Sequence, residues 1–339
     1  ARPATNGEFT KRAFLNGKLS LSSCEGLIDM INSESVAQIK SGFYLFKEKL
    51  KTRIEDLQTD LTDVLAGIDA NIDYPEEGLI VDNGEEIKQK LIAVKNVLEK
   101  LISSYSSGKI VVNGVKVALV GKTNTGKSSL LNTLTGEQRA IVTDVAGTTR
   151  DVVEGTLHIN GIKFTLFDTA GIRETDDPVE LLGIKRSNDL IRSADVILYV
   201  TDGTETADDE NLFKSKLDDK NIIFVRNKSD LSGENSSDGK IHISCVTGSN
   251  IDELKKELYR IGAGDVRTDG GYITEQRHYF ALKDALTSLD TAIASIGCEP
   301  LDLIAYDIKE CWEKLGEITG TTASESIIDA IFSKFCVGK

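Results

Sequence analysis

The sequence has few of the residues that mark specialised protein classes. Its 339 residues include four prolines and five cysteines, and no apolar run approaches the ~20 residues that a membrane-spanning helix needs. The cysteines are odd in number and lack the CxxC spacing of zinc sites, so they predict free thiols in a reducing compartment. These features argue against collagen-like, disulfide-stapled and membrane proteins, and we expect a cytoplasmic protein with no membrane partner.

Negative charge outnumbers positive charge. The chain has 40 Lys and Arg residues against 54 Asp and Glu residues, a net charge of −14. A protein that holds nucleic acid through bulk charge needs Lys and Arg to displace the counterions of the phosphates, so this class is disfavoured, although a local basic patch is not. The content of 40% hydrophobic and 28% charged residues is that of an ordinary globular protein. The length fits about two domains.

Two kinds of hydrophobic periodicity alternate along the chain. Apolar residues recur every three or four positions over about 21–104 and again over 282–296, which predicts amphipathic helices. Over 115–262, short apolar runs alternate with helical stretches, which predicts a mostly parallel sheet covered by helices. The turn residues YSSG at 105–108 are expected to end the first helical segment, and the NG pair at 160–161 predicts a β-hairpin.

A phosphate-binding motif follows the first expected strand. The sequence GKTNTGKS at 121–128 matches GxxxxGK[ST] and precedes an apparent helix. Its glycines let backbone N–H groups surround a phosphate, Lys127 reaches the β- and γ-phosphate oxygens, and the Ser128 hydroxyl binds Mg²⁺. The predicted phosphate-binding residues are Asn124, Thr125, Gly126, Lys127, Ser128 and Ser129.

A second motif, DTAG at 168–171, follows the strand expected before it. A carboxylate at this strand end would hold Mg²⁺, and the Gly171 N–H could meet a γ-phosphate. The hydroxyl-rich sequence GTTRD at 147–151 lies between the two motifs and could close on the metal. This segment adds Asp168, Thr169, Ala170 and Gly171 to the predicted nucleotide site.

A third motif predicts that the nucleotide is GTP. In NKSD at 227–230, the Asp230 carboxylate can accept hydrogen bonds from guanine N1–H and the 2-amino group. Adenine lacks this pair of donors and would leave the carboxylate unpaired. SCV at 244–246 is expected to complete the base pocket with backbone N–H groups. The predicted base-binding residues are Asn227, Lys228, Asp230, Ser244, Cys245 and Val246.

The order of these motifs predicts an α/β P-loop GTPase domain, with a mostly parallel sheet and flanking helices, inserted in an all-α helical domain. We assign 1–112 and 266–339 to the helical domain and 113–265 to the GTPase domain. Insertion is tolerated where the two ends of the inserted domain lie close together at the surface. Three domains in a row are an alternative that the hydrophobic pattern alone does not decide.

The sequence resembles the MnmE (TrmE) family of tRNA-modification GTPases over essentially its whole length. The resemblance lies in GEFTKRAFLNGKL at 7–19, in the GTPase motifs and in FCVGK at 335–339. It implies that the family's N-terminal folate-binding and dimerisation domain is missing here and that 1–20 is a remnant of the junction with it. The folate, of the 5-formyltetrahydrofolate type, is expected only with that domain, near Lys18 and Lys339.

The resemblance also implies how GTP is hydrolysed. Many GTPases have a water-orienting glutamine after the DxxG motif, whereas this sequence has Ile172, and no arginine finger is evident. The family instead uses potassium beside the phosphates and a glutamate that orients the attacking water. The matching residues are Asn124, Thr143, Val145 (through its backbone carbonyl) and Thr148 for K⁺, Thr149 for Mg²⁺ and Glu180 for the water.

The partners implied by the resemblance are GTP and GDP, tRNA, a second subunit that dimerises through the GTPase domains, and MnmG (GidA). MnmG is a flavoprotein that carries FAD, and the two proteins modify the tRNA wobble uridine with a C5 carboxymethylaminomethyl-type group. Two alternatives stay open from the motifs themselves. One is a ribosome-assembly GTPase of the Era or Der type, and the other is a GTP switch that does not hydrolyse usefully.

Overall fold

In the computed structural model the chain forms two compact units. One unit combines Ala1–Val112 with Arg267–Lys339, and the other is Asn113–Val266. The residues that the structure describes are 2–73, 84–136, 153–169, 189–204, 215, 220–232, 239–264, 266 and 271–337.

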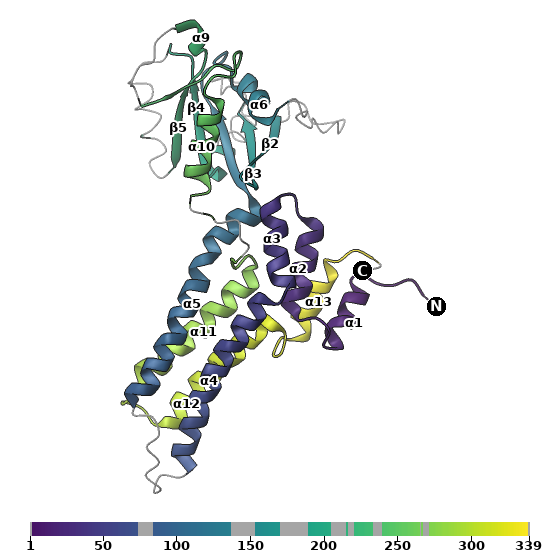
Figure 1. Cartoon of the computed structure of the whole chain (residues 1–339), viewed down its shortest axis with the longest axis vertical. Coiled ribbons are helices and arrows are strands. Elements are labelled where there is room, and N and C mark those ends of the chain that lie inside the picture. Colours follow the sequence, from purple (N-terminus) through teal and green to yellow (C-terminus); the bar gives the residue numbers. More distant parts are fainter. Residues whose placement is uncertain are drawn as a thin grey trace, which may run out of the picture. The chain divides into compact units, whose positions relative to one another are not determined.

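The first unit is built from helices in its described part (Figure 1). Local sequence sets several of their ends. Ser35 begins one helix with a capping box, in which its Oγ accepts from Gln38 N at 3.2 Å and Gln38 Oε1 accepts from Ser35 N at 3.0 Å. The helices are α1 (Glu8–Leu15), α2 (Leu21–Asn32), α3 (Val36–Phe46), α4 (Lys49–Asp73), α5 (Gly84–Asn113), α11 (Gln276–Ser295), α12 (Leu301–Thr319) and α13 (Glu325–Ser333).

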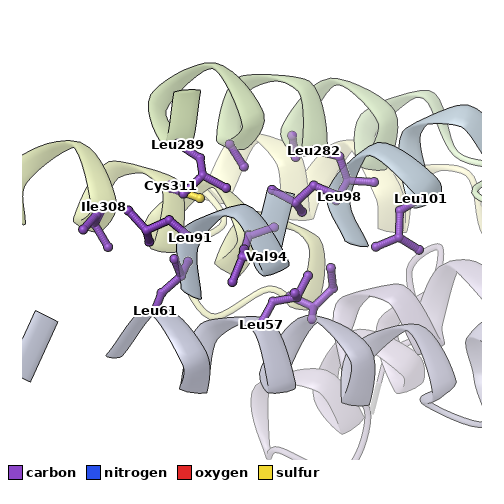
Figure 2. Close-up of a cluster of buried hydrophobic side chains, with 14 of the residues drawn as sticks. Leu57, Leu61, Leu91, Val94, Leu98, Leu101, Leu282, Leu289, Ile308 and Cys311 are labelled. Carbon is purple, nitrogen blue, oxygen red and sulfur yellow. The ribbon is translucent and has the colours of Figure 1, made fainter. Parts of the chain in front are cut away.

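The apolar stripes that predicted helices form one shared core. Figure 2 shows leucines of α4, α5 and α11 pointing toward one another, with Ile308 and Cys311 of α12 beside them. Leu61, Leu91 and Leu98 are fully buried there. Burial of a leucine side chain contributes about 2 kcal/mol, so a stripe of such residues holds the long helices together.

All five cysteines of the chain are free thiols, as their number and spacing predicted.

The predicted end of the first helical segment at 105–108 is wrong, because α5 continues to Asn113. Gly108 is a packing residue and not a turn residue: a Cβ atom there would lie 2.0 Å from the carbonyl oxygen of Ile273. Ser104 Oγ accepts a hydrogen bond from Ile273 N at 3.1 Å in the same contact. This close approach outweighs the cost of about 1 kcal/mol for glycine inside a helix.

The second unit is a six-stranded sheet in the order β2-β3-β1-β4-β5-β6, with helices beside it (Figure 1). Only β2 and β3 pair antiparallel among these strands. The turn between β2 and β3 has positive φ at Asn160 (50°) and Gly161 (83°), as the predicted hairpin requires. The elements are β1 (Val115–Val120), β2 (Val153–Ile159), β3 (Ile162–Asp168), β4 (Val196–Thr201), β5 (Asn221–Arg226), β6 (Ile241–His242), α6 (Lys127–Thr135), α9 (Ser229–Ser232) and α10 (Ile251–Gly262).

This topology positions the predicted motifs. Because β1 pairs in parallel with both β3 and β4, and β4 with β5, the carboxyl ends of these four strands lie at one edge of the sheet. Ligands of open α/β sheets bind at that edge, where the order of the strands reverses. The predicted fold class, an α/β unit inserted in a helical domain, is confirmed. Within the described ranges, no helix has the length and apolar character needed to cross a membrane.

Candidate functional site

A cavity of about 600 Å³ lies where the phosphate loop meets the segments that follow β5 and β6. Three stretches of sequence that are far apart along the chain line it. The lining residues are Asn124, Gly126, Lys127, Ser128, Ser129, Asn227, Lys228, Asp230, Leu231, Cys245 and Val246. All but Leu231 were predicted from the sequence motifs, so parallel strand topology alone brings these motifs together.

Leu231 was not predicted from the sequence, although it directly follows Asp230. Leu231 is 79% exposed, and Val246 is 88% exposed. The two residues give the base end of the cavity an apolar surface. An apolar residue next to the base-selecting carboxylate is the signal that could have identified Leu231, because a purine base is flat and largely apolar on its faces.

The phosphate loop is held in shape by its own backbone and by Asn227. Asn124 has φ of 64° and Gly126 has φ of 93°, both in the left-handed region. Asn227 Nδ2 donates to the Thr125 carbonyl at 3.0 Å, and a Cβ atom on Gly126 would lie 2.2 Å from the same nitrogen. Glycine is therefore required at Gly126. The loop leads into the N-terminus of α6, where the backbone N–H groups of the first turn and the helix dipole favour an anion.

The side chain of Lys127 is buried under this loop. Its Nζ donates to the carbonyl oxygens of Gly121 at 2.8 Å and Lys122 at 2.7 Å. The carbonyl dipoles hold the ammonium group next to the space that the loop encloses. A positive charge fixed at this point can meet phosphate oxygens with little rearrangement.

Ser128 and Asp168 together offer a site for a hard cation. Ser128 Oγ donates to Asp168 Oδ2 at 2.6 Å. Asp168 Oδ1 is buried and has no hydrogen-bond partner among the described residues. A buried carboxylate oxygen without a partner is costly, and hydroxyl and carboxylate oxygens are ligands that Mg²⁺ prefers. These two residues therefore fit a magnesium ion.

At the base end, the Asp230 carboxylate is oriented by Ser244. Ser244 Oγ donates to Asp230 Oδ1 at 2.6 Å and accepts from Thr247 N at 3.2 Å. Cys245 N donates to Asn227 Oδ1 at 3.3 Å, and this bond connects the SCV segment at 244–246 with the NKSD motif at 227–230. Burial raises the pKa of the Cys245 thiol, so this side chain is neutral near pH 7. The arrangement orients the Asp230 carboxylate and leaves lone pairs on its oxygens for a ligand.

Comparison with known proteins identifies the family. A protein of Natranaerobius thermophilus named tRNA modification GTPase MnmE is 41% identical over the whole of this chain, which covers 77% of that protein. The Acetivibrio thermocellus protein of the same name is 39% identical with the same coverage. The family model described as MnmE helical domain matches residues 21–336. The chain belongs to the MnmE family of tRNA modification GTPases. This confirms the resemblance stated from the sequence and the prediction of a GTPase.

The chain also resembles solved GTPase structures over part of its length. One is an Aquifex aeolicus Era variant bound to GDP and AlF₄⁻, with 30% identity and a TM-score of 0.38 over 51% of this chain and 66% of that one. The low TM-score means that this likeness adds nothing to the assignment of the family.

The structure brings together only some of the predicted site residues. The side chains of Thr125, Asp168, Thr169 and Ser244 are buried beside the cavity and do not line it. Thr169, for example, donates from Oγ1 to the Leu119 carbonyl at 2.6 Å. Lys18 is exposed in the helical unit. The predictions that lie outside the described residues concern Thr143, Val145, Thr148, Thr149, Ala170, Gly171, Glu180 and Lys339.

Proposed function

We propose that this chain binds GTP in the 600 Å³ cavity and hydrolyses it to GDP in support of tRNA modification. One observation carries the proposal: residues of three GTPase motifs line a single cavity at the carboxyl edge of the sheet, in a chain of the MnmE family. Membership of this family argues against the Era or Der alternative.

The phosphates would lie in the loop at 121–128. The N–H groups of the loop and of the first turn of α6 would donate to the β-phosphate, and the Lys127 ammonium would move from the two carbonyls to the β- and γ-phosphate oxygens. Ser128 and Asp168 would hold Mg²⁺, with Thr149 as a further ligand. When bound, Mg²⁺ supplies positive charge that stabilises the charge developing on the phosphate oxygens.

Hydrolysis needs a group that orients the attacking water, and Ile172 cannot do so. We propose Glu180 for this role, on the family resemblance. Replacing Glu180 with Ala is expected to lower turnover at saturating GTP about 100-fold, because general-base positioning typically contributes at least this factor. GTP affinity should stay within about threefold, since the role proposed for Glu180 is to contact the attacking water and not the nucleotide. Phosphate release and titration with a fluorescent GTP analogue measure the two quantities, and unchanged hydrolysis would end the assignment.

We propose that potassium takes the place of an arginine finger, held by Asn124, Thr143, the Val145 carbonyl and Thr148. Asn124 lines the cavity, and its amide oxygen is a ligand of the kind that binds monovalent cations. When bound, a potassium ion would supply positive charge to the charge that develops on the phosphates in the transition state, so we expect turnover about tenfold faster in potassium chloride than in sodium chloride. Asn124→Ala should remove most of this difference. Equal rates of the unmodified protein in the two salts would contradict the potassium assignment.

The remaining partners are proposals that rest on the family. We propose pairing of two chains through their GTPase units, action with the flavoprotein MnmG, which carries FAD, on the tRNA wobble uridine, and a folate donor near Lys18 and Lys339, all in the cytoplasm. With a net charge of −14, this chain alone is expected to bind tRNA weakly. Robust turnover without an added activator would separate this function from that of a GTP switch.

A further inference from the structure

The turn after β4 contains an acidic residue that the proposed mechanism does not use. Asp202 Oδ2 accepts a hydrogen bond from Lys228 Nζ at 2.8 Å, and the two charged groups form an ion pair. The two residues follow neighbouring parallel strands, since Thr201 of β4 pairs with Arg226 of β5. The Asp202 side chain is 17% exposed and does not line the cavity, whereas Lys228 does. Asp202 therefore contacts Lys228, a residue that lines the cavity, without lining the cavity itself.

The turn is constructed so that this carboxylate has one orientation. Thr204 Oγ1 donates to Asp202 Oδ1 at 2.8 Å, which leaves Oδ2 for Lys228. Gly203 N donates to Thr201 Oγ1 at 3.0 Å. Gly203 has φ of 90°, in the left-handed region that favours glycine, so a side chain at this position of the turn would be strained.

We infer that Asp202 is a positioning residue of the guanine site, which holds the Lys228 ammonium so that the aliphatic part of that side chain forms one wall of the base pocket. This inference rests on the proposed binding of GTP in the cavity. Lys228 itself has φ of 64°, which fixes the direction in which its side chain leaves the backbone. A lysine side chain has many rotamers, and a partner at its tip lowers the entropy lost when a base packs along its methylene groups.

The charge state of the pair supports this role. The hydrogen bond from Lys228 holds the pKa of Asp202 below its ordinary value, so the carboxylate is ionised at neutral pH. The ion pair is partly buried, with 38% of the Lys228 side chain exposed, and it is screened less than a pair on the open surface. Loss of the negative charge should release the lysine tip without removing any group that contacts the nucleotide.

Asp202→Asn tests the inference, because Asn keeps the size of the side chain and an acceptor for Thr204. We expect the Kd for GDP and GTP to rise about fivefold, as loss of a well-oriented ion pair predicts. The loss should appear in KM and not in kcat, since Lys228 is not placed at the reacting phosphate. In a Lys228→Met background the same substitution should have no further effect. Titration of the full chain with fluorescent GDP and GTP analogues gives these constants.

Asp195→Asn is the matched control. Asp195 directly precedes β4, whereas Asp202 directly follows it. Asp195 Oδ2 accepts a hydrogen bond from Lys116 N at 2.8 Å. The substitution therefore removes an equal charge at the end of β4 that is far from the cavity. It should leave the Kd unchanged. If Asp202→Asn is recovered unfolded, Thr204→Val is the second variant: it removes the hydroxyl bond to Oδ1, keeps the backbone bond from Thr204 N at 3.4 Å, and should weaken affinity about twofold, again only when Lys228 is present.

Two results would overturn the inference. One is an unchanged Kd in Asp202→Asn, and the other is an equal loss with and without Lys228, which indicates a purely structural turn. A failure of the proposed function is distinguishable from both, because the unmodified protein would then show no GTP binding that depends on Asp230. Thermal unfolding without nucleotide measures any separate effect on stability.

Discussion

Asp230→Asn is expected to lower the affinity for GTP at least about 100-fold. Ser244 Oγ donates to one oxygen of the Asp230 carboxylate at 2.6 Å and so orients the group, while each oxygen keeps a lone pair for the ligand. Guanine presents two N–H donors there, N1–H and the 2-amino group, and an asparagine would oppose one of them with its own amide donor. A buried donor left unpaired in this way typically costs a factor of this size.

Xanthosine triphosphate provides the control for this variant. Xanthine has a carbonyl oxygen at the position of the 2-amino group, so it can accept from the Asn amide while N1–H donates to the Asn oxygen. The variant should therefore bind XTP more tightly than GTP, which shows that it is folded. Competition titration with GTP, XTP and ATP measures all three affinities. If the unmodified protein bound ATP and GTP equally, the assignment of Asp230 would be refuted.

Lys127→Met should have a comparable effect on the phosphate end of the site. We expect GTP affinity to fall about 100-fold and hydrolysis to fall at least as much. The substitution keeps most of the side-chain length and removes a charge that two loop carbonyls hold next to the phosphate position. Charge-assisted hydrogen bonds to phosphate are among the strongest that a side chain makes, and the lysine also meets charge that develops during hydrolysis.

Lys122→Met is the matched control for Lys127→Met. Lys122 lies in the same loop, but it is exposed and does not line the cavity. Its removal should change GTP affinity by no more than about threefold, the size expected for an exposed charge near an anion. An equal loss in the two variants would mean that general positive charge, and not the position of Lys127, determines binding. Binding is measured by titration, and circular dichroism checks that each variant is folded.

The sequence predicted those parts of the fold that depend on local pattern. The hairpin at Asn160 and Gly161 follows from two residues that tolerate positive φ, and the strands follow from short apolar runs. The nucleotide cavity was predictable for a different reason: each motif follows a strand, and parallel strands bring their carboxyl ends to one edge.

Features that depend on contacts between distant segments could not be predicted in this way. Glycine is a residue type typical of turns, and only the close approach of Gly108 to Ile273 explains why it lies inside α5. Asp202 belongs to no motif, and its contact with Lys228 depends on the pairing of β4 with β5. A single sequence shows which residues are present, but it does not show which distant residues come into contact in the folded chain.

The central claim is that GTP occupies the cavity formed by the phosphate loop, the NKSD segment and the SCV segment. A crystal structure of this chain with Mg²⁺, K⁺ and a non-hydrolysable GTP analogue tests it most directly. We predict the triphosphate in the loop at 121–128, a metal ion beside Ser128 and Asp168, and the guanine edge against Asp230. A nucleotide bound elsewhere, or a guanine edge that points away from Asp230, would contradict the account.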